Sequence, residues 1–326
     1  MPKVTVLVAV YNASAYLRAC LDSLLSQTLA DFQAVCIDDC STDDSLAILQ
    51  EYHARDARFE VIHLDRNQGQ AHARNVGLQS ARGEYVCMLD ADDWFSADAL
   101  QRAVEVFQRD RDTDSVLFEV SMDYASHSAP YAMPAFERLS GEEAFRLSLT
   151  WQIHGLYMVR ADIHQRIPFD ETCKLYSDDN TTRLHYLASR RVGRCTGVYH
   201  YRQHNGSATH AVSVRRFDYL RANESMRQSL LEQKVSSDVL ALYENHRWLN
   251  LIDVYMFYFL HGHELPKQER QYGLSELHRV WQNIDRSLLS SHAIRKFGYR
   301  PMSSWRLFRL QEWLYFSLRG LLRKNY

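Results

Sequence analysis

The stretch V86-C-M-L-D-A-D-D-W94 is an apolar run that leads directly into three aspartates. Tyr85–Leu89 reads without a break, as is typical of a parallel strand buried on both faces. Parallel α/β sheets bind ligands outside the carboxyl ends of their strands, so the acids should lie at the mouth of a site. Asp90 and Asp92 are two residues apart, so both should leave one face of the strand and share a hard divalent cation. Asp93 should point elsewhere and could cap the next helix.

Two other interpretations of these aspartates have to be weighed. Aspartates at strand ends often belong to solvated turns, and this stretch by itself leaves that alternative open. A calcium-binding EF-hand loop starting at Asp90 would need glycine at its sixth position and glutamate at its twelfth. The chain has Phe95 and Gln101 there, which excludes such a loop.

Size and composition predict a large folded domain with an appendage. The chain has 326 residues, of which 46% are hydrophobic, and its formal net charge is −2. A nearly neutral chain without basic and aromatic repeats has no general attraction to nucleic acid. Small molecules or lipid-bound molecules are therefore the expected partners.

The cysteines and the N-terminus both favour a cytoplasmic protein. The six cysteines include no CxxC pair, and most of them fall within apolar strand or helix patterns, as free cysteines do. The apolar run Val4–Val10 follows Lys3 but is short and rich in valine, so it predicts a first strand rather than a signal peptide. The N-x-S/T triplets, such as those at Asn12, Asn180 and Asn205, then predict no glycosylation.

The first half of the chain alternates strands with helices. Strands are predicted at Val4–Val10, Phe32–Ile37 and Phe59–Leu64 before the Asp90 strand, with a helix after each, the first of them capped by Ser14. This alternation predicts a doubly wound α/β domain with helices on both faces. Neither GxGxxG nor GxxxxGK[ST] follows the first strand, so a phosphate here would have to be held by a metal.

The next segments complete this domain. A helix at 97–109 and a strand at 115–122 end a nucleotide-binding half of residues 1–122, and residues 123–212 form an acceptor half that contains a loop at 124–134. Y176-S-D-D179 precedes a predicted helix, and a helix N-terminus favours ionised carboxylates, as a general base requires.

Four motifs follow one another in the order and spacing of a known family. They are V8-A-V-Y-N12, I37-D-D-C-S-T-D-D44, N67-Q-G-Q-A-H-A-R-N-V-G77 and L89-D-A-D-D-W94. The chain therefore resembles inverting glycosyltransferase family 2, the single-domain GT-A type that builds bacterial polysaccharides, over roughly its first two thirds. Four ordered motifs are far more specific than one DxD pair.

The resemblance implies roles for residues at the strand ends. Ala9, Tyr11 and Asp39 would line the pocket for uracil and ribose, with Arg74 near the nucleotide. Without the resemblance, Asp39 could simply cap the second helix, and an arginine such as Arg74 is most often a solvated helix residue.

The resemblance also implies a metal and a late loop. Asp90 would serve the ribose and the metal, and Asp92 would be the direct ligand of Mg²⁺ or Mn²⁺. Y199-H-Y-R-Q-H-N-G-S207 resembles a Tyr-Tyr-Arg loop that closes over the diphosphate through Arg202 and His204. A zinc site made of the histidines here is disfavoured, because their spacing matches no compact ligand pattern.

The catalytic base comes from the acids before the acceptor-side helix. The family carries Glu-Asp there, which aligns with Asp178 and Asp179 and makes Asp179 the candidate base. Because this chain has Asp-Asp, Asp178 stays open as the alternative.

The last third, residues 213–326, is predicted to be all-helical. In its final segment, 303–325, leucines repeat every three or four residues, and arginines mostly occupy the other face. Such a helix either lies in the plane of an anionic membrane or packs on its own domain, and the sequence leaves both open. The arginines exclude a transmembrane span.

Together these features predict a metal-dependent inverting glycosyltransferase. It would move a sugar from a UDP-sugar to a hydroxyl of a glycan or lipid-linked glycan during cell-surface polysaccharide synthesis, in the cytoplasm or on the inner face of the cell membrane. A sugar-nucleotide pyrophosphorylase would carry a glycine-rich loop after the first strand, and an aspartate-dependent phosphatase would carry DxDx[TV] near the N-terminus. A non-catalytic sugar-nucleotide-binding protein stays open, since fold alone does not establish activity.

Overall fold

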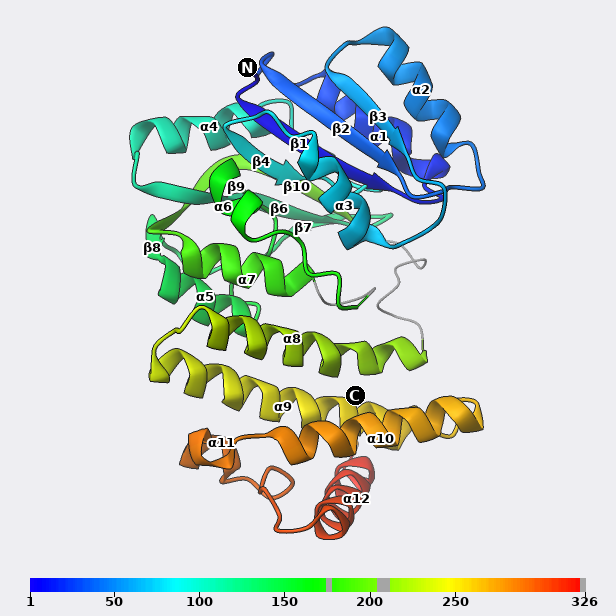
Figure 1. Cartoon of the computed structure of the whole chain (residues 1–326), viewed down its shortest axis with the longest axis vertical. Helices are drawn as coiled ribbons and strands as arrows, with labels where there is room; N and C mark the ends of the chain where they lie inside the picture. Colours follow the sequence, from blue (N-terminus) through cyan, green and yellow to red (C-terminus); the bar gives the residue numbers. More distant parts are fainter. Residues whose placement is uncertain (174–177, 204–211, 323–326) are drawn as a thin grey trace. The chain divides into compact units, whose positions relative to one another are not determined.

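The computed structural model describes residues 1–173, 178–203 and 212–322. The chain divides into two compact units (Figure 1). The N-terminal unit comprises residues 1–174 and 181–207, and the helical unit comprises residues 175–180 and 208–326.

The N-terminal unit is built on one mixed sheet. Its strands follow the order β3-β2-β1-β4-β9-β6-β10-β5, with β7 beside β6 and β8 beside β10. The strands are β1 (Val4–Val10), β2 (Phe32–Asp38), β3 (Phe59–His63), β4 (Tyr85–Met88), β5 (Trp94–Phe95), β6 (Thr113–Asp123), β7 (Ser128–Pro130), β8 (Arg138–Ser140), β9 (Tyr157–Arg160) and β10 (Arg191–Arg202).

The four strands that the sequence predicts to alternate with helices are parallel neighbours. β1 pairs with β2 on one side and β4 on the other, and β2 pairs with β3. Beyond β4 the sheet changes character, because β9 runs antiparallel to both β4 and β6. The predicted α/β fold is therefore confirmed, and the carboxyl ends of β1, β2 and β4 share one edge.

Helices cover both faces of this sheet. They are α1 (Ser14–Leu25), α2 (Ser45–Arg55), α3 (Gln70–Gln79), α4 (Ala99–Arg109), α5 (Gly141–Leu149), α6 (Ala161–Arg166) and α7 (Asp178–Ala188), whose first three residues belong to the helical unit. Side chains alternate along β1, so Val4, Val6 and Val8 pack with α1, α2 and α4, whereas Leu7 packs with α3 on the opposite face (Figure 1).

Close packing explains one glycine of the third motif. Gly77 lies in α3 directly over β2, and a Cβ added there would come within 2.4 Å of the Cδ1 atom of Ile37. A side chain at this position would force the Ile37 side chain or α3 itself to shift. The glycine therefore fixes the distance between α3 and β2.

The start of α1 differs from the prediction. Ser14 is the first residue of the helix, and the N-cap position before it is Ala13, which makes no side-chain capping hydrogen bond. Instead the carboxylate of Asp43 accepts from the backbone N–H groups of Ser14 and Ser45, both at 3.0 Å. Asp43, in the loop before α2, thus accepts hydrogen bonds at the starts of both α1 and α2. A prediction that considers only the residues next to each helix in the sequence does not find this contact.

The helical unit forms a separate core. Its helices are α8 (Asp218–Glu232), α9 (Ser237–His261), α10 (Lys267–Asn283), α11 (Ser291–Ile294) and α12 (Trp305–Leu321), with 3₁₀ turns at Val214–Phe217 and Arg286–Leu288. Trp248, Leu251 and Phe308 are among its fully buried side chains. The predicted all-helical extension is confirmed. Among the described residues, no helix is both long enough and apolar enough to cross a membrane.

Candidate active site

The acids of the opening motif lie in a turn at the carboxyl end of β4. The strand ends at Met88, and the backbone N–H of Asp93 donates to the carbonyl of Asp90 at 3.0 Å. Asp90 and Asp92 are therefore not on one strand face, as strand alternation predicts, because the chain leaves the extended conformation before it reaches them. The turn still presents both carboxyl groups beyond the end of the strand, and both residues are partly exposed.

α3 holds Asp90 in place. The Oδ1 atom of Asp90 accepts from Nη2 of Arg74 at 2.5 Å and from Nε2 of Gln70 at 3.0 Å. Arg74 is only 2% exposed, and its guanidinium group lies 5.3 Å from the ring centroid of Phe169. A buried arginine interacts with protein groups and not with water, so the alternative that Arg74 is a solvated helix residue is wrong.

Arg202 ties the end of β10 to the same turn. Its Nε atom donates to the carbonyl oxygen of Asp92 at 2.7 Å. The guanidinium group lies 4.5 Å from the ring centroid of Trp94 and 5.0 Å from that of Tyr16. Trp94 in turn stacks on His200 with a centroid distance of 5.0 Å. The geometry of the turn is thus set by aromatic and cationic side chains from two distant segments.

Asp93 is a buried part of the site, not a helix cap. Its carboxylate accepts from the Tyr199 hydroxyl and from the backbone N–H of Arg202, both at 2.8 Å, and the residue is fully buried. The Tyr199 hydroxyl also accepts from the backbone N–H of Asp90 at 3.1 Å. Burial, followed by the charge of Asp90, raises the pKa of Asp93 to about 8. Asp93 and Tyr199 therefore stabilise the turn through buried hydrogen bonds.

The residues predicted for the nucleotide lie at the neighbouring strand ends. Ala9 is half-buried in β1, and Tyr11 just beyond it is 51% exposed. Asp39 follows β2, and its carboxylate accepts from the backbone N–H groups of Gln68 and Gly69, both at 2.8 Å. Asp39 therefore fixes the loop before α3 and does not cap α2. The predicted roles of these residues toward uracil and ribose stay predictions.

The two candidate bases lie at the start of α7. Asp178 and Asp179 form the first turn of α7, within the helical unit, and the backbone N–H of Asp179 donates to Oδ1 of Asp178 at 3.2 Å. Both residues therefore lie at a helix N-terminus, where the sequence places them. His204 lies outside the described residues. The catalytic role of the two acids and the diphosphate role of His204 stay predictions.

The donor set fits a cation that arrives with a diphosphate. No group of three or more His, Cys, Asp or Glu side chains in the described parts of the chain is arranged to hold a metal ion. Mg²⁺ is commonly bound through one or two carboxylates, with substrate phosphates and water completing its octahedron. Asp92 and Asp90 supply that number of oxygen donors at the strand end, so these residues fit Mg²⁺ or Mn²⁺.

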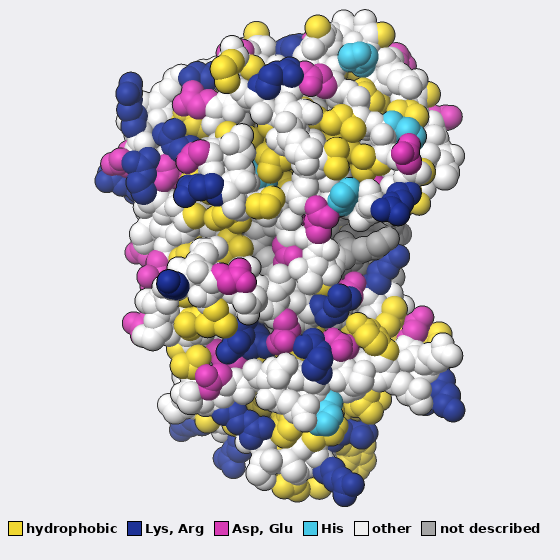
Figure 2. Space-filling model, viewed as in Figure 1, with side chains coloured by type: hydrophobic (Ala, Val, Ile, Leu, Met, Phe, Trp, Pro, Cys, Tyr) yellow, Lys and Arg dark blue, Asp and Glu magenta, His cyan; other side chains and the backbone are white. Residues whose placement is uncertain are grey.

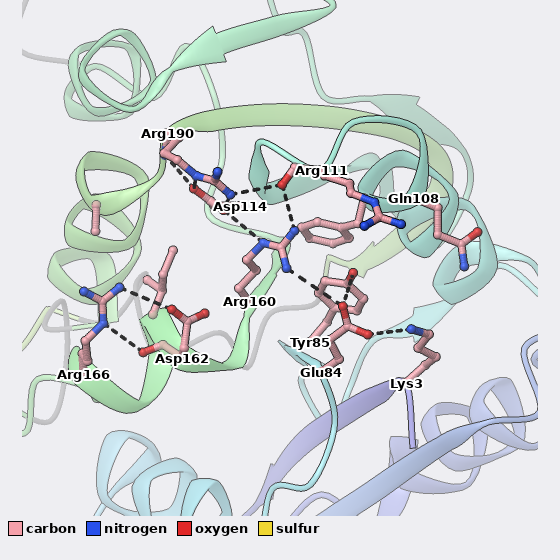
Figure 3. Close-up of a pocket in the computed structure, with 13 residues that line it drawn as sticks. Lys3, Glu84, Tyr85, Gln108, Arg111, Asp114, Arg160, Asp162, Arg166 and Arg190 are labelled. Atoms are coloured by element: carbon pink, nitrogen blue, oxygen red, sulfur yellow. Dashed lines mark hydrogen bonds and ion pairs between the residues drawn. The ribbon is translucent and has the colours of Figure 1, made fainter. Parts of the chain in front are cut away.

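A cavity of about 810 Å³ lies at the opposite end of the sheet (Figure 3). It is lined by residues that start or precede strands, such as Lys3, Tyr85 and Asp114, and by Arg160 at the end of the antiparallel strand β9. Its location at the amino ends of the parallel strands is opposite to where α/β sheets bind substrates.

Most of the charged side chains of this cavity are paired, although its lining holds five basic residues and three acids. Lys3 pairs with Glu84 at 2.5 Å, while Arg160 and Arg190 both pair with Asp114, at 3.0 and 2.8 Å. Burial would raise the pKa of Asp114, but the hydrogen bonds and charge of Arg190 hold it below its usual value. Because the cavity lies at the amino ends of the parallel strands and its acids already have basic partners, the candidate active site remains the turn after β4.

Comparisons with known proteins match this chain to glycosyltransferases. Residues 5–164 match the family model described as Glycosyl transferase family 2. The chain is 31% identical over 222 residues to the uncharacterized glycosyltransferase EpsJ of Bacillus subtilis (strain 168), covering 64% of this chain and 63% of EpsJ. It is 40% identical over 104 residues to the putative teichuronic acid biosynthesis glycosyltransferase TuaG of the same organism, covering 32% of this chain and 41% of TuaG.

A solved structure shares the fold over nearly the whole chain. The crystal structure of S. aureus TarS 1-349 in complex with UDP-GlcNAc matches with a TM-score of 0.77 and covers 99% of this chain and 92% of that one. The sequence identity is 20%, so this likeness shows the fold alone. The chain spans less than two thirds of the length of EpsJ and of TuaG.

Proposed function

Because this chain belongs to glycosyl transferase family 2, we propose that it transfers a sugar from a UDP-sugar to a hydroxyl group of a glycan or lipid-linked glycan. The observation that carries the proposal is the turn at residues 90–93. Its carboxyl groups gather at the carboxyl end of a parallel strand and are fixed there by Arg74, Tyr199 and Arg202. Rigid placement of this kind is what a transfer site needs.

The proposed donor is a uridine diphosphate sugar. Ala9, Tyr11 and Asp39 contribute the side that faces uracil and ribose, next to Arg74 and Asp90. Support comes from the positions of these residues along one sheet edge and from the fold shared with a protein solved with UDP-GlcNAc. At the diphosphate end, Arg202 and His204 offer positive charge and hydrogen-bond donors.

The proposed cofactor is Mg²⁺ or Mn²⁺. Asp92, together with Asp90, would hold the cation through carboxylate oxygens. When bound, the cation offsets the negative charge that develops on the departing diphosphate. The ion pair between Arg74 and Asp90 orients that carboxylate before any ligand arrives.

The proposed reaction is a single displacement. Asp179, with Asp178 as the alternative, accepts the proton of the acceptor hydroxyl while that oxygen attacks the anomeric carbon. The bond from the anomeric carbon to UDP breaks on the opposite side, so the configuration inverts. Both candidate bases lie in the first turn of α7.

The proposed acceptor belongs to a cell-surface polysaccharide, and the protein works in the cytoplasm or on the inner face of the cell membrane. Support comes from the relative TuaG, whose name places it in teichuronic acid biosynthesis. A lipid-linked acceptor would be presented at a membrane surface, where an amphipathic helix such as α12 can hold the enzyme.

A panel of UDP-sugars tests this function directly. The purified protein is incubated with each sugar, with Mn²⁺ or with an excess of chelator, and released UDP is measured. We expect one or a few sugars to release UDP, and the chelator to stop the release. Calorimetric binding of UDP without turnover of any sugar, with or without added glycan acceptors, would favour a non-catalytic sugar-nucleotide-binding protein. UDP release that continues at the same rate in excess chelator would contradict the proposed requirement for a metal ion.

A further inference from the structure

The leucines of α12 are not the residues that pack it onto the helical unit. The buried side of the helix consists of Phe308, Gln311, Glu312, Tyr315 and Phe316. The predicted leucine stripe lies on the outside, with exposed fractions from 40 to 82% at Leu307, Leu310, Leu314, Leu318 and Leu321. Packing on its own unit therefore does not explain the stripe, and an exposed apolar face of this length indicates a binding surface.

The charge that borders this face has one sign. Arg306 and Arg309 are exposed on α12, and the only acid of the helix, Glu312, is fully buried. Burial raises the pKa of Glu312 to about 8, so at neutral pH it does not offset the arginines. Figure 2 shows basic and hydrophobic side chains gathered over the part of the helical unit that Figure 1 labels α12.

A pocket of about 550 Å³ opens at the edge of the leucine face. Aromatic side chains from α9 and α12 form much of its lining, including Tyr258, Phe259 and Trp313. Three arginines also line it, Arg270 from α10 and Arg306 and Arg309 from α12, whereas no acid does. Within the described residues, none of these three arginines forms an ion pair with Asp or Glu, unlike Arg160 and Arg190 in the cavity of Figure 3.

We propose that this pocket binds the phosphate group of an anionic phospholipid while the leucine face of α12 enters the interfacial region of the bilayer. Guanidinium groups match the geometry of phosphate oxygens, and aromatic rings prefer the boundary between headgroups and acyl chains. The inference deepens the membrane part of the proposed function, but it rests on the helical unit alone.

Charge favours a lipid surface over a second copy of this chain. A two-fold dimer through the leucine face would set the same patch against itself, so Arg306 and Arg309 would meet a surface that carries the same excess of positive charge. Like charges brought together in this way oppose association. An anionic bilayer instead supplies acyl chains for the leucines and phosphates for the arginines.

Co-sedimentation with vesicles tests the proposal on the full chain. The vesicles contain either phosphatidylcholine alone or phosphatidylcholine with phosphatidylglycerol. The pocket variant is Arg306→Gln with Arg309→Gln, and the control is Arg295→Gln with Arg300→Gln, which removes the same charge from exposed positions of the same unit. We expect the pocket variant to bind anionic vesicles at least tenfold more weakly than the control. Circular dichroism and thermal melting check that both variants fold.

A second experiment distinguishes binding to a lipid from binding to free phosphate and from association with a second copy of this chain. Leu307→Ser with Leu314→Ser should also reduce vesicle binding, whereas millimolar inorganic phosphate should not displace wild-type protein from the vesicles. Equal binding by the pocket variant and its control would overturn the proposal. Concentration-dependent dimers that the leucine variant loses, with no binding to anionic vesicles, would assign the face to a second copy and overturn it as well.

The same variants keep this inference distinct from the proposed function. UDP release from soluble UDP-sugar does not use the helical pocket, so it should be unchanged in the pocket variant. Vesicle binding by a wild-type protein that turns over no UDP-sugar would refute the transferase and leave the lipid site standing.

Discussion

The two ends of the sheet in the N-terminal unit both gather charged side chains, but they arrange them in opposite ways. At the carboxyl end, Asp90, Asp92 and Asp93 share one turn, and the pKa of Asp93 is raised to about 8. At the amino end, Glu84 and Asp114 alternate with Lys3, Arg160 and Arg190 (Figure 3).

The difference shows how a charged cluster can be classified. Acids and bases alternate at the amino end, so its acids already have basic partners although they border the cavity of about 810 Å³. At the carboxyl end the acids lie beside one another, and their mutual repulsion favours a cation from outside. Charge arrangement, more than cavity volume, therefore identifies the candidate active site.

The largest effect is expected from removing one acid at the carboxyl end. Asp92→Ala should lower the rate of sugar transfer roughly 10³-fold or more, because charge stabilisation by a metal is worth several kcal/mol. Asp162→Ala, which removes a mostly exposed acid that lines the amino-end cavity, should leave the rate unchanged. Steady-state kinetics on a UDP-sugar that is turned over would check both. Full activity of Asp92→Ala would remove the functional distinction between the two ends.

The next prediction concerns the two neighbouring aspartates at the start of α7. Asp179→Asn should lower kcat roughly 10²-fold, the lower end of the range for a general base, because Asp178 beside it can take over part of the role. UDP affinity should persist, and Asp178→Asn should be milder. Calorimetry and single-turnover transfer would separate the two effects. A larger loss in Asp178→Asn would move the base by one residue.

The sequence predicts the parallel half of this fold because its signals are local. Alternating apolar strands and helices identify β1 to β4 within a few residues, and ordered strand ends place Asp39 and Asp90 at one edge. The environment of Asp93 depends on Tyr199, which is 106 residues away, so no local pattern distinguishes this buried acid from a helix cap.

A second limit concerns which face of a helix is buried. The leucine stripe of α12 correctly indicates two faces, but the core takes Phe308, Tyr315 and Phe316 together with the polar pair Gln311 and Glu312. Large aromatic side chains fill that core better than the leucines do, and hydrophobicity alone cannot rank the two faces. Arg74 is a similar case, because its burial depends on Asp90 and Phe169 from other elements.

A buried acid without neighbouring acids offers a contrast to Asp93. The pKa of Glu312 is raised from 4.5 to about 8. Between these two pH values, Glu312 is therefore protonated in the folded state and ionised in the unfolded state. Stability from this group is full below pH 4.5 and is lost as the pH rises toward 8. Glu312→Gln should remove about 2 kcal/mol of the fall in unfolding free energy between pH 5 and pH 7. Urea denaturation at both pH values would measure this, and identical pH profiles would show that Glu312 ionises normally.

The smallest effect is expected at the amino end, where an acid has a structural role. Asp114 is nearly buried and accepts from Arg160, from the side chain of Arg190 and from its backbone N–H. Asp114→Asn keeps the shape but loses the charge, so the unfolding free energy at pH 7 should fall by about 1 kcal/mol, with kcat and KM unchanged. The pKa of Asp114 is lowered, so its stabilisation exists above the unfolded value of 3.8 and disappears as the pH falls through the lower folded value. In urea denaturation the stability difference between the variant and the wild type should therefore shrink as the pH falls below 3.8. If the variant instead loses sugar transfer while remaining folded, the amino-end network contributes to function and the contrast between the two ends of the sheet is wrong.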